Sequence, residues 1–407
     1  MNTFERQTLR AALGELQGDI KAGTTHPLAL GKIEMISFLL AYSLAREGEG
    51  YSGQSIAGEV AYLQKAQSDE QEIVASLAQR QSARVAVAAT ELTAYLRARL
   101  GNSEVEVVEA QTLLGGISKE TSILKLKGAD QFGNVLVLRR DLEGGPVELK
   151  AADEFPIVHQ MHERGIAVPR PLWADHSPPF PGTCMVMQAV PGKTVYDATG
   201  MKLGDNGHGA ALGLARVLGR IHSTPVTELG LPNLNVNTPL RQHVEQTINR
   251  YEDQWQRRRT SASPTLTAAF DWLRGNVPET RDLSLVHGDA SLRNLLVHEG
   301  RESALLDWEL WHLGDHNEDL AYCKHDVEQF VPWNDFLSEY HAHGGRPVDA
   351  GALRFYGIFG ALRNSVFAEN LVHSYEHMPE PEPKFAYGAL LGGRPLICGI
   401  AAGLSQA

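Results

Sequence analysis

The chain has 407 residues and a formal net charge of −12, with 43% hydrophobic and 21% charged residues. This length is sufficient for two or three domains with a substantial core, and the composition is that of a globular protein. An acidic chain lacks the basic face that a sequence-independent nucleic-acid binder needs, so we expect no nucleic-acid partner.

Neither the N-terminus nor any apolar run suits secretion or membrane insertion. The first ten residues lack the apolar core of a signal peptide. The best apolar run, Ile33 to Leu44, is interrupted by polar residues and is too short to span a bilayer. The three cysteines lack the paired spacing of a zinc site or a disulfide framework: Cys184, Cys323 and Cys398. We therefore expect a cytoplasmic protein without a membrane partner.

Residues 1–102 are predicted to form a small all-α domain of four helices. Apolar residues recur there at helical spacing, and the last helix is expected to end at Gly101-Asn102. No cluster of acids, histidines or cysteines indicates chemistry in this part. Docking or oligomerisation, through a partner protein or a second copy, is the role expected of residues 1–102.

The stretch from Leu285 to Leu320 is unusually rich in acidic and carboxamide side chains. Two apolar runs at 295–297 and 304–306 flank a polar turn and predict a hairpin. Asn294 precedes the first strand and Asp307 follows the second, so the hairpin makes them neighbours, and Asp289 is within reach of the same point. Hard cations such as Mg²⁺ prefer such oxygen ligands. An ordinary acidic hairpin with its carboxylates in water is the alternative.

Three short motifs follow one another in this stretch. They read His287-Gly288-Asp289 with Asn294 after four more residues, then Leu305-Leu306-Asp307-Trp308-Glu309, then Gly314-Asp315 with Asp319-Leu320-Ala321 after three more. In this order they resemble the catalytic core of the aminoglycoside phosphotransferase (APH)-like branch of the protein-kinase-like fold.

The resemblance implies roles for the polar residues of the three motifs. Asp289 would orient and deprotonate the attacking hydroxyl, while Asn294 and Asp307 would hold Mg²⁺ against the phosphates of ATP. Asp315 and Asp319 match family positions that brace the loop. ATP and Mg²⁺ are the cofactors that this resemblance predicts.

The resemblance also implies an α+β fold class, a bilobal protein-kinase-like (APH-like) fold preceded by the small all-α helical domain. We expect residues 103–190 to form the N-lobe, an antiparallel sheet plus one helix. Residues 191–407 are expected to form a mostly helical C-lobe with the catalytic hairpin and the acceptor site.

A glycine turn between two strands is predicted at Gly115-Gly116. Without side chains at the turn, backbone N–H groups can approach phosphate oxygens, although an ordinary hairpin has the same pattern. The sequence from Gly115 to Thr121 is similar to that of one bacterial APH-like subgroup. This resemblance implies that Ser118 and Thr121 add hydroxyl contacts to phosphate.

Arg139 ends the apolar run 135–138, in the place of the phosphate-binding lysine of kinases. Its permanent charge and bidentate fork can keep the role of that cation. On the helix expected from Val147 to Arg164, Glu154 is the acid best placed to pair with Arg139. Glu148 and Glu163 are the competing candidates.

The remaining C-lobe predictions concern nucleotide and acceptor contacts. Gln188 and Val190 belong to the expected hinge, which contacts adenine through its backbone. A helix between Gly207 and His222 is expected beneath the site.

Arg257-Arg258-Arg259 could meet an anionic substrate tail or form a solvated helix face. C-terminal helices are expected to wall the acceptor site, and the polar residues singled out on them are Arg354, Arg363 and Asn364.

His341 and His343 are spaced like metal ligands, but no third ligand lies nearby in the sequence, so a metal site is not predicted there.

The predicted function is an ATP- and Mg²⁺-dependent phosphotransferase that acts on a hydroxyl of a small molecule. The sequence of residues 306–322 resembles that of bacterial phosphotransferases related to the kinase part of acyl-CoA dehydrogenase fusion proteins. That resemblance implies a catabolic acceptor such as a hydroxyacyl-CoA or a phenolic ketone. An aminoglycoside or another antibiotic is the alternative acceptor. The alternative of another class is a catalytically silent nucleotide-binding scaffold that acts through residues 1–102.

Overall fold

The computed structural model describes most of the chain from residue 87 onward. The described ranges are 55–61, 87–113, 118–142, 144–196, 206–231, 234–259, 262–279, 282–377 and 383–405. Most of the predicted N-terminal helices and the pair Gly115-Gly116 lie outside these ranges. The chain divides into two compact units, and each is described by itself. One contains residues 85–249 and 274–360, and the other contains residues 1–84, 250–273 and 361–407.

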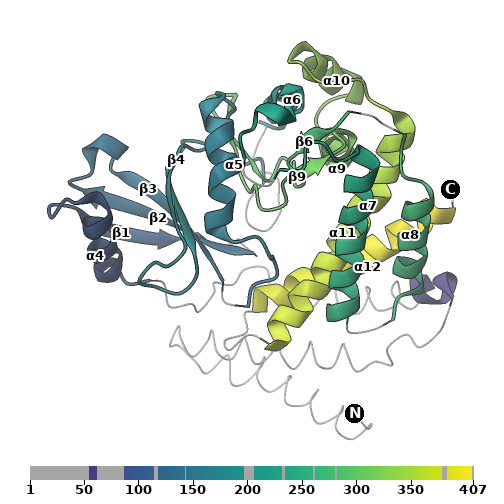
Figure 1. The fold of residues 1–407 in the computed structure, drawn as a ribbon, viewed down its shortest axis with the longest axis horizontal. Helices are drawn as coiled ribbons and strands as arrows, with labels where there is room; N and C mark the ends of the chain where they lie inside the picture. Colours follow the sequence, from purple (N-terminus) through teal and green to yellow (C-terminus); the bar gives the residue numbers. More distant parts are fainter. Residues whose placement is uncertain are drawn as a thin grey trace, which may run out of the picture. The chain divides into compact units, whose positions relative to one another are not determined.

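A five-stranded antiparallel sheet lies at the start of the first unit (Figure 1). Its strand order is β1-β2-β3-β5-β4, and the strands are β1 (Glu106–Thr112), β2 (Lys119–Lys127), β3 (Val135–Asp141), β4 (Pro171–Asp175) and β5 (Cys184–Gln188). In the register of β2 and β3, Thr121 lies opposite Arg139 and Lys119 lies opposite Asp141. Because side chains alternate along a strand, these four residues share one face of the sheet.

Two helices pack against the sheet. Helix α4 (Ala89–Leu100) lies against β1, and its Leu92 and Leu96 join a buried cluster with Leu124 and Leu136. Helix α5 (Ala151–Glu163) packs against β3, β4 and β5. It begins four residues later than Val147, the predicted start, because the amide of Ala151 donates to the carboxylate of Asp141 at 2.9 Å. The mixed sheet and helix of the predicted N-lobe are therefore present.

The rest of the first unit is mainly helical and contains two small antiparallel sheets. Its helices are α6 (Gly207–Ser223), α9 (Asn317–Val327), α10 (Trp333–Ala342) and the first parts of α7 (Leu240–Arg258) and α11 (Ala350–His377). The short strands are β6 (Ser284–Val286), β7 (Leu295–His298), β8 (Arg301–Leu305) and β9 (His312–Gly314). Strand β6 pairs with β9, and β7 pairs with β8.

The predicted hairpin is formed by β7 and β8. Its turn consists of Glu299 and Gly300, with φ angles of 49° and 77°. Two positive φ angles in a two-residue turn match the right-handed twist of the flanking strands. The apolar side of α6 lies beneath the two small sheets, where Leu214, Leu218 and Ile221 are fully buried. This helix corresponds to the one predicted between Gly207 and His222.

The second unit contains α8 (Pro264–Gly275), α12 (Pro383–Ser405) and the remaining parts of α7 and α11. The carboxylate of Glu59 accepts hydrogen bonds from the amide and the hydroxyl of Thr265 at 3.0 and 2.6 Å. These bonds satisfy an otherwise unpaired donor at the start of α8. Among the described helices, none has the length and apolar character needed to cross a membrane.

Candidate active site

The loop that follows β6 brings the three predicted catalytic and metal-binding residues to one end of the hairpin. The side-chain amide of Asn294 donates to the Asp289 carboxylate at 2.8 Å and to the Asp289 carbonyl at 3.0 Å. The amide of Leu306 donates to the carbonyl of Asn294 at 2.8 Å, which places Asp307 beside them. The convergence that the spacing predicted is therefore present.

His287 connects the loop to the residue before Asp307. Its Nδ1 accepts a hydrogen bond from the amide of Asp289 at 3.2 Å, so the ring proton is on Nε2. That Nε2 donates to the carbonyl of Leu306 at 3.1 Å. The ring also packs edge-on against Trp308, with centroids 4.6 Å apart. His287 thus fixes Asp289 and Asp307 relative to each other.

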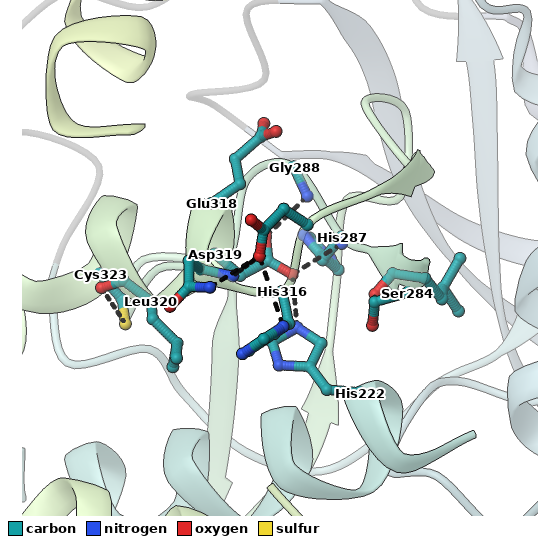
Figure 2. A network of polar contacts seen from close by, with 12 residues as sticks. His222, Ser284, His287, Gly288, His316, Glu318, Asp319, Leu320 and Cys323 are labelled. Atoms are coloured by element: carbon teal, nitrogen blue, oxygen red, sulfur yellow. Dashed lines mark hydrogen bonds and ion pairs between the residues drawn. The ribbon is translucent and has the colours of Figure 1, made fainter. Parts of the chain in front are cut away.

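Asp319 braces the loop from below (Figure 2). Its fully buried carboxylate accepts hydrogen bonds from the amides of His287 and Gly288, both at 2.8 Å, and lies 3.0 Å from Nε2 of His222. Nδ1 of His222 in turn lies 2.9 Å from the hydroxyl of Tyr340. Burial opposes the charge of Asp319, but the hydrogen bond and charge of His222 outweigh it and lower the pKa of Asp319. The bracing role expected of Asp319 agrees with these contacts.

Gly288 is needed at its position for a steric reason. Its φ is +82°, and a Cβ added there would lie 2.4 Å from the carbonyl oxygen of Leu310. Asp307 also has a positive φ of 69°, which is costly for a residue with a Cβ. The anchored residues on both sides of Asp307 hold it in this conformation and aim its carboxylate.

Asp315, the other residue expected to brace the loop, contacts Asn317. Its Oδ1 accepts hydrogen bonds from the backbone amide and the side-chain amide of Asn317 at 2.9 and 2.7 Å. Asp315 is fully buried and lies at the start of α9. It therefore holds the first turn of this helix.

Arg139 of β3 brings positive charge to the acidic end of the hairpin. Its guanidinium forms an ion pair with Asp307, lies 3.4 Å from Oε2 of Glu309, and lies 3.5 Å from Oε2 of Glu154. The expected pairing with Glu154 is thus present, whereas the competing acids Glu148 and Glu163 are exposed. The contact with Asp307 was not predicted.

Burial and crowding of carboxylates shift the pKa values around Arg139. Burial raises the pKa of Glu154 to about 7, although the positive charge of Arg139 opposes this rise. Burial, followed by the charge of Asp307, raises the pKa of Glu309 to about 8. Burial disfavours the charge of Arg139 itself, but Asp307, Glu154 and Glu309 outweigh it and raise its pKa. The site therefore retains a permanent cation, while Glu154 and Glu309 take up protons near neutral pH.

The donor set at the end of the hairpin suits Mg²⁺. This ion is usually held by one or two carboxylates and by substrate phosphates, so Asp307 and the amide oxygen of Asn294 are sufficient. The described residues contain no group of three or more His, Cys, Asp or Glu that could hold a metal alone. Nε of Arg139 and Oε1 of Glu154 are buried without a hydrogen bond to the described residues.

The other predicted nucleotide contacts lie on the sheet. Ser118 is buried at the start of β2, and Thr121 is half-buried opposite Arg139. The amide of Gln188 donates to the carbonyl of Arg170 at 2.9 Å, so the sheet uses this amide. Val190, the other residue of the expected hinge, is half-buried.

Three residues of the site had no role assigned from the sequence. Glu309 belongs to the second motif, and its position two residues after Asp307 was the available signal. His287 likewise stood in the first motif. His222 had no local signal, because its partner Asp319 is 97 positions away in the sequence.

The model of the phosphotransferase enzyme family matches residues 109–356, which is more than half of the chain. The chain belongs to this family. The matched range contains the sheet apart from the first residues of β1, the loop after β6, the hairpin and Arg139. The predicted relationship to APH-like phosphotransferases is therefore confirmed.

Curated relatives include two acyl-CoA dehydrogenase family members. Member 10 of Mus musculus is 28% identical over 244 residues, which are 58% of this chain and 22% of that protein. Member 11 of Homo sapiens is 27% identical over 241 residues, which are 57% of this chain and 30% of that protein. The match therefore spans less than a third of the length of these relatives.

Solved structures share the fold at low sequence identity. A Ralstonia eutropha protein provisionally named an aminoglycoside phosphotransferase has a TM-score of 0.58 and 20% identity, over 78% of this chain and 98% of that one. The apoenzyme of macrolide 2'-phosphotransferase MphH from Brachybacterium faecium has a TM-score of 0.52 and 18% identity, over 74% and 97%. These similarities confirm the predicted α+β, APH-like fold class.

Proposed function

We propose that the chain transfers the γ-phosphoryl group of ATP to a hydroxyl of a catabolic small molecule, with a hydroxyacyl-CoA or a phenolic ketone as the favoured acceptor. The observation that carries the reaction type is the cluster of Asp289, Asn294 and Asp307 opposite Arg139. It combines a base, oxygen ligands for a cation and a fixed positive charge, as phosphoryl transfer requires.

In this proposal Asp289 is the catalytic base. It accepts the proton of the acceptor hydroxyl while the hydroxyl oxygen bonds to the γ-phosphorus. The bond from that phosphorus to the bridging oxygen breaks, and ADP leaves. The side-chain amide of Asn294, 2.8 Å from the Asp289 carboxylate, holds this base in place. Because the transition state is loose, most of the rate gain comes from positioning and charge stabilisation.

Asn294 and Asp307 would hold Mg²⁺ in this proposal, and the bound ion would neutralise charge on the phosphates. Arg139 would then exchange its contact with Asp307 for the phosphate oxygens and remain oriented by Glu154. A guanidinium suits this role because its fork can bind two oxygens at once. The glycine turn, with Ser118 and Thr121, is expected to cover the phosphates.

The acceptor proposal is supported by the curated relatives. Their matched portions belong to proteins named as acyl-CoA dehydrogenase family members. A phosphotransferase joined to such an enzyme has a use for hydroxylated acyl thioesters or related catabolic compounds. Of the residues expected to select the acceptor, Arg354 is exposed, Asn364 is half-buried and Arg363 is buried.

The proposal is tested by incubating the full chain with ATP and Mg²⁺ against hydroxyacyl-CoAs, phenolic ketones and aminoglycosides. ADP release and the mass of one added phosphoryl group on the acceptor are followed. Turnover with a hydroxyacyl-CoA or a phenolic ketone supports the proposal, and turnover only with aminoglycosides overturns the favoured acceptor. ATP binding without turnover of any acceptor favours a nucleotide-binding scaffold.

A further inference from the structure

The N-terminus of α5 is capped by residues from outside the helix. Lys150, the residue at its N-cap position, makes no capping hydrogen bond with its side chain. The amide of Ala151 donates instead to Oδ1 of Asp141 at 2.9 Å, and the amide of Ala152 donates to the hydroxyl of Thr183 at 3.2 Å. Two of the donors that a helix start leaves unpaired are thus satisfied by the last residue of β3 and by the residue that precedes β5.

Asp141 is the centre of this arrangement. Besides the amide of Ala151, its carboxylate accepts hydrogen bonds from Nζ of Lys119 at 2.9 Å, the amide of Thr183 at 3.2 Å and the hydroxyl of Thr183 at 2.7 Å. The side chains of Lys119 and Asp141 are only 3% and 6% exposed. Burial opposes ionisation of Asp141, but the hydrogen bond of Thr183 and the charge of Lys119 outweigh it and lower its pKa.

Two of the three partners of Asp141, Lys119 and Ala151, lead to different parts of the site. Lys119 begins β2, directly after Ser118 and the predicted glycine turn. Ala151 begins α5, and Glu154 follows one turn later with its carboxylate 3.5 Å from Arg139. A shift of the first turn of α5 would therefore move Glu154 away from the cation that it orients.

We propose that Asp141 is a positioning residue for nucleotide binding, which links the start of β2 to Glu154 through the N-terminus of α5. This inference rests on the proposed function, because it assumes that Arg139 binds nucleotide phosphates. Asp141 does not touch the nucleotide in this account. It acts by fixing α5 at the position where Glu154 meets Arg139.

The test is a double-substitution cycle on the affinity for MgADP, measured by isothermal titration calorimetry with the full chain. We expect Asp141→Asn and Glu154→Gln each to weaken MgADP binding about tenfold, which corresponds to about 1.4 kcal/mol. If Asp141 acts through Glu154, the double variant binds no more weakly than Glu154→Gln alone, because contacts in one network are not additive.

A matched control is available in the same sheet. Glu109 is the carboxylate partner of Lys125 on β2 at 2.8 Å, but this pair is about half exposed. Glu109→Gln removes a lysine partner without touching α5, so we expect unchanged MgADP affinity.

A second variant keeps the test decisive if Asp141→Asn does not fold. Lys119→Met combined with Asp141→Asn removes both charges, so no lysine is left buried and unpaired. We expect weaker MgADP binding in this variant and faster hydrogen exchange of the amides of residues 151–154. If the losses of MgADP affinity in Asp141→Asn and Glu154→Gln add up in the double variant, the inference is wrong. It is also wrong if a folded Asp141 variant binds MgADP with wild-type affinity. Both results leave the proposed function untouched. Failure of the wild-type chain to bind MgADP overturns the proposed function first.

Discussion

The two halves of the site are built in different ways. In the acidic half, residues 285–320, the key bond joins Asn294 to Asp289, only five positions apart, and a hairpin brings Asp307 beside them. In the cationic half, Arg139 contacts Asp307 across 168 positions, and Asp141 holds a helix that begins ten positions later. The acidic half depends on local spacing, whereas the cationic half depends on how the sheet and α5 pack.

Asp307→Ala should have the largest effect, because it removes the one residue on which both halves converge. We expect phosphoryl transfer to fall on the order of 10³-fold, since a preorganised electrostatic contact is lost. The rate of ADP formation with the acceptor found in the panel measures this. The melting temperature serves as the control for folding. A folded variant with activity near that of the wild type would show that phosphoryl transfer does not depend on Asp307.

Asp319→Asn tests whether the acidic half needs the hydrogen bonds of the buried Asp319 carboxylate. Asn cannot accept from His287, Gly288 and His222 as a carboxylate does, so buried donors lose their partner. We expect the free energy of unfolding to fall by roughly 3 kcal/mol, measured by urea titration. A loss of less than about 0.5 kcal/mol would contradict the role of this buried network.

The contribution of Asp319 to the free energy of unfolding should also depend on pH, and its pKa gives the direction. The pKa of Asp319 is lowered on folding. Its contribution is therefore present above the unfolded pKa, near 4, and is lost as the pH falls through the lower folded pKa. Urea titrations from pH 6 to pH 3 should show a shallower loss of stability in Asp319→Asn than in the wild type. Equal slopes would contradict the lowered pKa.

Arg139→Lys should have the smallest effect, and it addresses the cationic half. Lysine keeps the charge but cannot contact Glu154 and two further carboxylates with one planar fork. We expect the KM for MgATP to rise roughly tenfold, equivalent to about 1.4 kcal/mol, with a smaller change in kcat. An unchanged KM would mean that the arginine is not needed for the geometry of this half.

The acidic half could be predicted from the sequence because its signals are local. The apolar runs predicted the strands of the hairpin, and the spacing of Asn294 and Asp307 around it predicted their proximity. The motif also provided Asp289 and the loop that Asp319 braces. Short-range periodicity and turn residues determine the hairpin and can be read directly from the chain, whereas the roles of Asp289 and Asp319 came from the family resemblance.

The cationic half was predicted only in part. The pairing of Arg139 with Glu154 followed from the resemblance, because an acid on the next helix was expected to face the strand. The contact of Arg139 with Asp307 did not follow, since it depends on the packing of distant segments. The late start of α5 was missed because its cap is supplied by Asp141 of β3 and not by the residue that precedes the helix.

The central claim is that Asp289 is the base of a phosphotransferase whose nucleotide site is formed by the other residues. The most direct measurement compares wild type and Asp289→Asn for two quantities, MgADP affinity by calorimetry and phosphorylation of the panel acceptor by mass spectrometry. We predict unchanged affinity and a loss of transfer of about 10²- to 10⁴-fold. Transfer at the wild-type rate by the folded variant would contradict the account.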